Sequence, residues 1–181
     1  MLVDLAVDES GADGHFGRVR DWMRSTGWSQ PDPTAYDPFH EKYPADSFGE
    51  RSTGHFPGRG VYTFVVGRDI YTGGGDSYGP RCLGCGTEYN FEEAVDLVVA
   101  WSDSYVEPVL SCTSCSRTDL MGNWEIAGSL AVASFAIILD VDYHFDRNPL
   151  IAADPDPLIA ALRDGLRSEL GGRWVHMCEN I

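Results

Sequence analysis

The sequence predicts an α+β protein: an antiparallel sheet covered by helices, with a cysteine-rich insert. Segments with the two-residue period of half-buried strands are interspersed with segments whose apolar residues follow helical spacing. The chain has 181 residues, of which 43% are apolar, enough to bury a sizeable core. Two Cys-x-x-Cys pairs, at 82–85 and 112–115, mark a segment with a chemistry of its own.

The first two elements are a strand over 3–7 and a helix over 13–27. In the strand, Val3, Leu5 and Val7 alternate with smaller or acidic residues. In the helix, apolar side chains recur every three or four positions, with Asp13 placed to cap the start and Gly27 to end it.

Residues 28–60 predict an ordered but irregular arm laid over the core. Five prolines between Trp28 and Gly60 disfavour regular elements, and five aromatic residues among them disfavour disorder. Long irregular connections are uncommon in compact domains. The arm fits two roles equally well, part of a partner-binding surface or plain packing against the core.

The middle of the chain predicts a strand over 61–66, a glycine loop over 73–76 and a helix within the cysteine spacer. The strand is rich in β-branched and aromatic residues. The helix opens with Asn90 and Glu93 in a capping-box arrangement. A strand over 106–111, interrupted by Pro108, leads to the second cysteine pair.

The last third predicts a central strand, a helix and a closing strand. Residues 124–132 fit helix and strand equally. The strand over 135–144 shows clear alternation, and a helix follows with Asp154 and Pro155 at its start. Gly171 and Gly172 end this helix before a strand over 174–178.

This order of elements resembles the ferredoxin-like sandwich, in which helices cover one face of an antiparallel sheet. The resemblance is one of topology. It implies a core domain over 1–79 and 117–181, which includes the 28–60 arm, and an inserted module over 80–116.

The two cysteine pairs supply the four ligands of a closed zinc site. The ligands are Cys82 and Cys85 in the first pair and Cys112 and Cys115 in the second, with 26 residues between the pairs. Each pair can hold one edge of a tetrahedron. The segment over about 80–116 resembles a zinc ribbon or zinc knuckle, although Ser116 stands where such modules usually have glycine. Four thiolates leave no open position, so we expect one structural Zn²⁺ per chain. The alternative is a redox role with each pair forming a disulfide.

A second candidate site lies at the end of the predicted central strand. Asp140, Asp142 and His144 share one strand face, where they suit a metal ion or a general base. An acidic strand end that simply emerges into solvent explains the same residues. His176 and Cys178 also share a face, and a lone cysteine there is more often a small buried residue than a nucleophile.

The net charge of the chain limits the classes of partner that it can bind. The formal net charge is −15, from 13 basic and 28 acidic residues, which repels nucleic acid and anionic membranes. The acidity fits a solvated surface or a docking face for a basic protein. The opening residues lack the pattern of a signal peptide, and the longest apolar run is too short to span a bilayer, so we expect a cytoplasmic protein.

We therefore expect a non-enzymatic zinc-binding protein that binds another, basic protein, as an immunity protein, inhibitor or adaptor does. One rival is a metal-dependent hydrolase that uses Asp140, Asp142 and His144. The other is a zinc ribbon that binds nucleic acid. The sequence leaves the oligomeric state open.

Overall fold

The computed structural model describes residues 1–35, 43–56, 58–74, 77–141 and 156–178. In these residues the chain forms four α-helices, a six-stranded sheet and a separate two-stranded hairpin. The elements are β1 (Leu2–Asp4), η1 (Glu9–Gly11), α1 (Ala12–Ser25), β2 (Ser29–Pro31), β3 (Asp46–Phe48), α2 (Glu50–His55), β4 (Gly60–Thr72), α3 (Phe91–Ser104), β5 (Val109–Ser111), β6 (Thr118–Leu120), η2 (Met121–Asn123), β7 (Leu130–Val141), α4 (Asp156–Leu170) and β8 (Trp174–His176).

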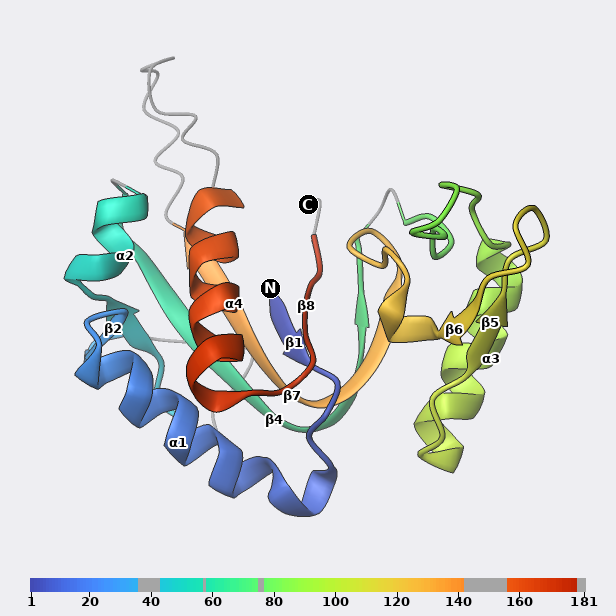
Figure 1. The fold of residues 1–181 in the computed structure, drawn as a ribbon. Coiled ribbons are helices and arrows are strands. Elements are labelled where there is room, and N and C mark those ends of the chain that lie inside the picture. Colours follow the sequence, from blue (N-terminus) through green and yellow to red (C-terminus); the bar gives the residue numbers. More distant parts are fainter. Residues whose placement is uncertain (36–42, 57, 75–76, 142–155, 179–181) are drawn as a thin grey trace.

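The large sheet has the strand order β2-β3-β4-β7-β1-β8, and every neighbouring pair is antiparallel. Four adjacent strands of this sheet, in the order β8-β1-β7-β4, follow one another along the chain as β1, β4, β7 and β8. Helix α1 lies between β1 and β4, together with β2, β3 and α2, and helix α4 lies between β7 and β8. The segment between β4 and β7 contains α3, β5 and β6. Figure 1 shows α1, α2 and α4 together at one end of the molecule, and α3 with the β5–β6 hairpin at the other end. The predicted mixture of helices with an antiparallel sheet is therefore confirmed.

Two buried clusters lie on opposite faces of the sheet. Successive strand residues point to opposite sides, so Leu2 and Phe64 enter one cluster while Val3 and Val65 enter the other. We call them the helix-side core and the cysteine-side core. The helix-side core combines residues of α1 and α4 with residues of the sheet and Trp28. They include Leu2, Phe16, Val19, Met23, Trp28, Phe64, Phe135, Leu158, Leu162 and Trp174.

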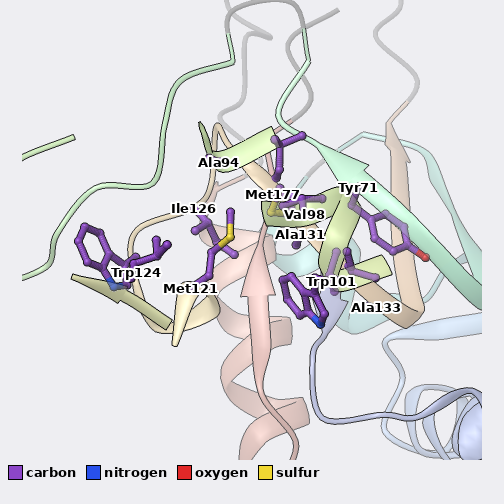
Figure 2. Close-up of a cluster of buried hydrophobic side chains, with 14 of the residues drawn as sticks. Tyr71, Ala94, Val98, Trp101, Met121, Trp124, Ile126, Ala131, Ala133 and Met177 are labelled. Atoms are coloured by element: carbon purple, nitrogen blue, oxygen red, sulfur yellow. The ribbon is translucent and has the colours of Figure 1, made fainter. Parts of the chain in front are cut away.

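The cysteine-side core is built around α3 and the first half of β7. Figure 2 shows buried side chains of this core, which come from α3, β7 and the segment after the second cysteine pair, and also from β4 (Tyr71) and from Met177 after β8. They include Ala94, Val98, Trp101, Met121, Trp124, Ile126, Ala131 and Ala133. Helices therefore lie against both faces, whereas the sequence predicted helices on one face only. The reason is that Ala131, Val132 and Ala133 are all buried, and a strand that is apolar on both sides needs cover on both.

The paired strands β4 and β7 bend at a bulge in β4. The register shifts between Val66 and Asp69, and Gly67 lies in between with φ of +121°, a conformation that suits glycine. Figure 1 shows both strands curving as they run from one end of the molecule to the other. Both strands contribute side chains to both cores.

The 28–60 segment, predicted to be irregular, contains β2, β3 and α2 in its described part. Residues 36–42 and 57 lie outside the described residues. Trp28, Phe48 and Phe56 are buried in the helix-side core. Asp46 is fully buried, where it accepts hydrogen bonds from Arg24 (2.6 and 2.8 Å) and Ser29 (2.8 Å) and so ties β3 to α1 and β2.

Several boundaries also differ from the prediction. β1 ends at Asp4 because the Asp4 carboxylate accepts the N–H of Ala6 (3.0 Å) and turns the chain. α1 begins one residue before Asp13, after the separate turn η1. The strand expected over 106–111 is β5, and it pairs with β6 rather than with the large sheet. The ambiguous 124–132 stretch ends as the start of β7.

Candidate metal centre

The four predicted ligands come together at one end of the cysteine-side core. Cys82 and Cys85 lie in the turn that precedes α3, and Cys112 and Cys115 lie in the turn between β5 and β6. Their Sγ atoms all lie within 4.8 Å of one another. Two pairs are closer, Cys82–Cys115 at 3.6 Å and Cys85–Cys112 at 3.5 Å. Sulfurs about 2.3 Å from one metal ion at tetrahedral angles would be about 3.8 Å apart, so the spacing suits a metal ion.

The two turns have the same backbone pattern. In the first, the N–H of Cys82 bonds to the carbonyl of Thr87 (2.9 Å), and the N–H of Gly86 bonds back to Cys82 (2.8 Å). In the second, the corresponding bonds run from Cys112 to Arg117 (2.8 Å) and from Ser116 to Cys112 (3.0 Å). The sequence resemblance between the pairs therefore extends to their local structure.

Gly86 and Ser116 occupy equivalent positions, one residue after the second cysteine of each pair. Both have the left-handed conformation, with φ of 75° and 59°. The prediction that glycine suits this place is thus explained by the turn itself, and Ser116 adopts a conformation that is less favourable for a residue with a Cβ atom.

Each pair places one sulfur inside and one outside. Cys82 and Cys112 are buried members of the cysteine-side core, whereas Cys85 and Cys115 are exposed. The centre therefore lies at the boundary between the core and the solvent, attached to the packed interior through the first cysteine of each pair.

Backbone N–H groups and neighbouring sulfurs shift the pKa values of the clustered cysteines. The backbone N–H groups of Cys115 and Ser114 lower the pKa of Cys112 to about 6. At Cys115 the N–H of Arg117 lowers the pKa, but the three neighbouring sulfurs outweigh it and raise the pKa to about 12. The shifts of Cys112 and Cys115 therefore have opposite directions. A bound metal ion would supply positive charge.

The sequence reasoning missed Thr87. Its hydroxyl oxygen lies 3.2 Å from the Cys85 sulfur and 2.9 Å from the Ser114 hydroxyl, so it bridges the two turns and lowers the pKa of Cys85. A threonine two residues after a cysteine carries no recognisable signal without the fold. Groups of this kind orient metal ligands and tune them.

The donor set is compatible with a zinc-ribbon-like module, with one departure. The predicted helix in the spacer is present as α3, and the Asn90 side chain caps it by accepting the N–H of Glu93 (3.0 Å). A 14-residue helix therefore separates the two cysteine pairs. Around a bound metal ion, the four sulfurs would occupy all four positions of a tetrahedron.

The second predicted site is described only in part. Asp140 lies at the exposed end of β7, and it lines a pocket of about 380 Å³ with Asp32 and Arg59. Asp142 and His144 lie outside the described residues, as do Asp154 and Pro155. The grouping of Asp140, Asp142 and His144 therefore stays a prediction.

Two further histidines, His176 and His15, lie beside Cys178 and Asp4, away from the cysteine cluster. Burial lowers the pKa of His176 and raises that of Cys178, whose Sγ lies 3.6 Å from His176 Nε2. A neutral thiol beside a neutral imidazole is the opposite of an activated nucleophile. His15 is buried with its Nε2 3.2 Å from Asp4, an ion-pair geometry that links α1 to β1 and that the sequence did not reveal.

None of the helices in the described ranges combines the length and the apolar character needed to cross a bilayer. Comparison of the chain with protein-family models, with curated proteins and with solved structures found no match.

Proposed function

We propose that the chain is a zinc-binding protein whose single metal ion is structural and whose work is to bind a basic partner protein. The observation that supports the metal most directly is the pair of matching turns, which bring four sulfurs within 4.8 Å of one another. Four thiolates in a tetrahedron favour Zn²⁺ or iron. Zinc suits a role without redox chemistry.

The ion would join two turns that are far apart in sequence. The first turn leads directly into α3, and the second closes the β5–β6 hairpin. Since Cys82 and Cys112 belong to the cysteine-side core, the free energy of metal binding would contribute to folding of that half of the molecule. A cytoplasmic location fits this role, because a reducing compartment keeps the thiols free.

The proposed partner follows from charge. Residues 80–116 contain one basic and six acidic residues, a net charge of −5. A zinc tetrathiolate would add about −2. Such a surface attracts basic proteins and repels phosphate backbones. An immunity, inhibitor or adaptor role therefore fits this charge better than nucleic-acid binding does.

We also propose a ferredoxin-like classification for the core. Its support is the connection order β1-α1-β4-β7-α4-β8 with the spatial order β8-β1-β7-β4. The strands β2 and β3 then extend one edge, and residues 80–116 form an insert between β4 and β7. In this division the core domain comprises 1–79 and 117–181.

The first test is metal content. The purified chain should contain one zinc and no iron by elemental analysis. Cys82→Ser and Cys112→Ser should each lose the metal and lower the free energy of unfolding, because metal binding supplies folding free energy.

The matched control is Cys178→Ser, because Cys178 lies outside the cluster. This variant should keep one zinc per chain and most of its stability. A Cys82→Ser protein that retained zinc with unchanged stability would contradict the structural role, as would a wild-type protein that bound none.

A further inference from the structure

Exposed apolar side chains gather on the cysteine segment. Of the seven large hydrophobic side chains that are exposed in the described ranges, six lie between residues 83 and 109 and the seventh is Ile70 on β4. The six are Leu83, Val95, Val99, Tyr105, Val106 and Val109. Gathered exposed apolar residues commonly mark interaction surfaces.

Helix α3 contributes two of these residues on a side that the fold does not use. Its Ala94, Val98 and Trp101 are buried in the cysteine-side core. Val95 and Val99 lie one turn apart and are 36% and 50% exposed. The packed side of α3 is complete without them, so packing among the described residues does not explain these two valines.

Acidic side chains lie beside the two valines. Glu92, Asp96 and Asp103 are exposed, and their spacing of four and seven residues places them along the same side of the helix. Neither α3 nor the segment after it up to Ser116 contains a basic residue. The outer face of α3, formed by Glu92, Val95, Asp96, Val99 and Asp103, therefore combines an apolar row with an acidic row.

The outer face is held in place from both ends of the helix. Asn90 caps the first turn (3.0 Å to the N–H of Glu93). Arg68 donates hydrogen bonds to the carbonyls of Ser102 (3.1 Å) and Trp101 (2.7 Å) at the last turn. A surface that is ordered before binding loses less conformational entropy when a partner docks.

We infer that the outer face of α3 docks a segment of a partner protein that presents apolar side chains flanked by lysine or arginine. This inference rests on the proposed interaction function and assigns it a surface. A second copy of the chain would place like charges together, and nucleic acid or an anionic membrane would be repelled. A basic amphipathic segment matches both rows, with apolar contacts on the valines and cations beside the carboxylates.

The test uses the full-length, zinc-loaded chain and two synthetic peptides. One peptide is an amphipathic helix with leucine on one side and lysine on the other, and its counterpart has glutamate for lysine. Amide spectra of the ¹⁵N-labelled chain should shift at the outer face with the lysine peptide and not with the glutamate peptide. The affinity should fall as salt is raised.

Three variants decide whether the surface is the right one. The double variant Val95→Ser with Val99→Ser should weaken binding of the lysine peptide by about tenfold or more, because it removes the apolar contacts without changing the charge. Ile70→Ser, which changes an exposed apolar residue on β4, should bind like the wild type. The triple variant Glu92→Gln, Asp96→Asn and Asp103→Asn changes no apolar contact, so it should weaken binding and reduce the salt dependence.

Equal binding by the wild type and the double variant would overturn the inference. So would shifts centred on another surface, or self-association of the chain through α3. Zinc content and circular dichroism of every variant keep this outcome separate from the metal proposal. A chain that holds one zinc but shows no shift at α3 refutes the docking surface alone.

Discussion

The residue that follows each second cysteine shows how local geometry selects amino-acid type. Gly86 and Ser116 make the same turn with positive φ, and glycine adopts this conformation without steric cost. The four cysteines were predictable because their spacing is written locally in the chain. The hydroxyl bridge of Thr87 was not, since it joins turns separated by a helix.

The conformation of Ser116 leads to a stability prediction. Ser116→Gly should raise the free energy of unfolding by up to about 1 kcal/mol, because it relieves the left-handed strain. Gly86→Ala should lower it by about the same amount for the converse reason. Urea denaturation at saturating zinc measures both.

Thr113→Gly is the control, because it changes an exposed residue of the second turn that lacks a positive φ. It adds flexibility to the unfolded chain without relieving strain, so it should lower stability. A gain at Thr113 comparable to that at Ser116 would show that the turn, rather than residue 116, is strained.

At the scale of the elements, length decided what the sequence could reveal. Helices α1, α3 and α4 have 14 or 15 residues, enough for apolar spacing to repeat over several turns. The strands β2 and β3 have three residues each, too few to show alternation, and the prolines around them hid their pairing. The pairing of β5 with β6 was not predicted, because the three residues of β6 are too few to show alternation.

The bulge in β4 is linked to the last turn of α3 through one side chain, and this link can be tested. It carries Arg68, which binds the last carbonyls of α3 and lies 4.2 Å from the ring of Tyr105. Arg68→Ala should lower the free energy of unfolding by about 1–3 kcal/mol, since charged hydrogen bonds at a helix C-terminus are lost. Denaturant titration measures the loss, and amide exchange in residues 99–105 should accelerate.

Arg163→Ala serves as the comparison for Arg68. Arg163 is paired with its neighbour Asp164 on the surface (3.3 Å), and such pairs contribute less than about 1 kcal/mol. If both variants lost the same small amount, Arg68 would not be anchoring α3.

At the scale of the molecule, the described residues form two cores that share one sheet. The antiparallel sheet and the helix content followed from sequence periodicity, but the presence of cover on both faces did not. That arrangement depends on where the curved β4–β7 pair places its apolar residues, which is a property of the bulge and of long-range packing.

Removal of the metal should therefore destabilise the cysteine-side core more than the helix-side core. After chelation, amide exchange should rise in α3, in the β5–β6 hairpin and in the 130–133 part of β7, because these residues share the cysteine-side core with Cys82 and Cys112. Exchange in α1 and α4 should change much less. Hydrogen–deuterium exchange with mass spectrometry measures this, and zinc addition should restore protection. An increase confined to residues 80–90 and 110–118 would mean that the metal organises its own turns and nothing beyond them.

Each cysteine pair has one buried and one exposed member, so reagents in solvent can reach the centre from one side only. A competing thiol, chelator or oxidant from solvent meets Cys85 and Cys115 before it meets their buried partners. Ligand exchange would then proceed stepwise from the outside, with the ion still tethered to the interior through Cys82 and Cys112. A centre of this kind is asymmetric in its kinetics although its four donors are chemically alike.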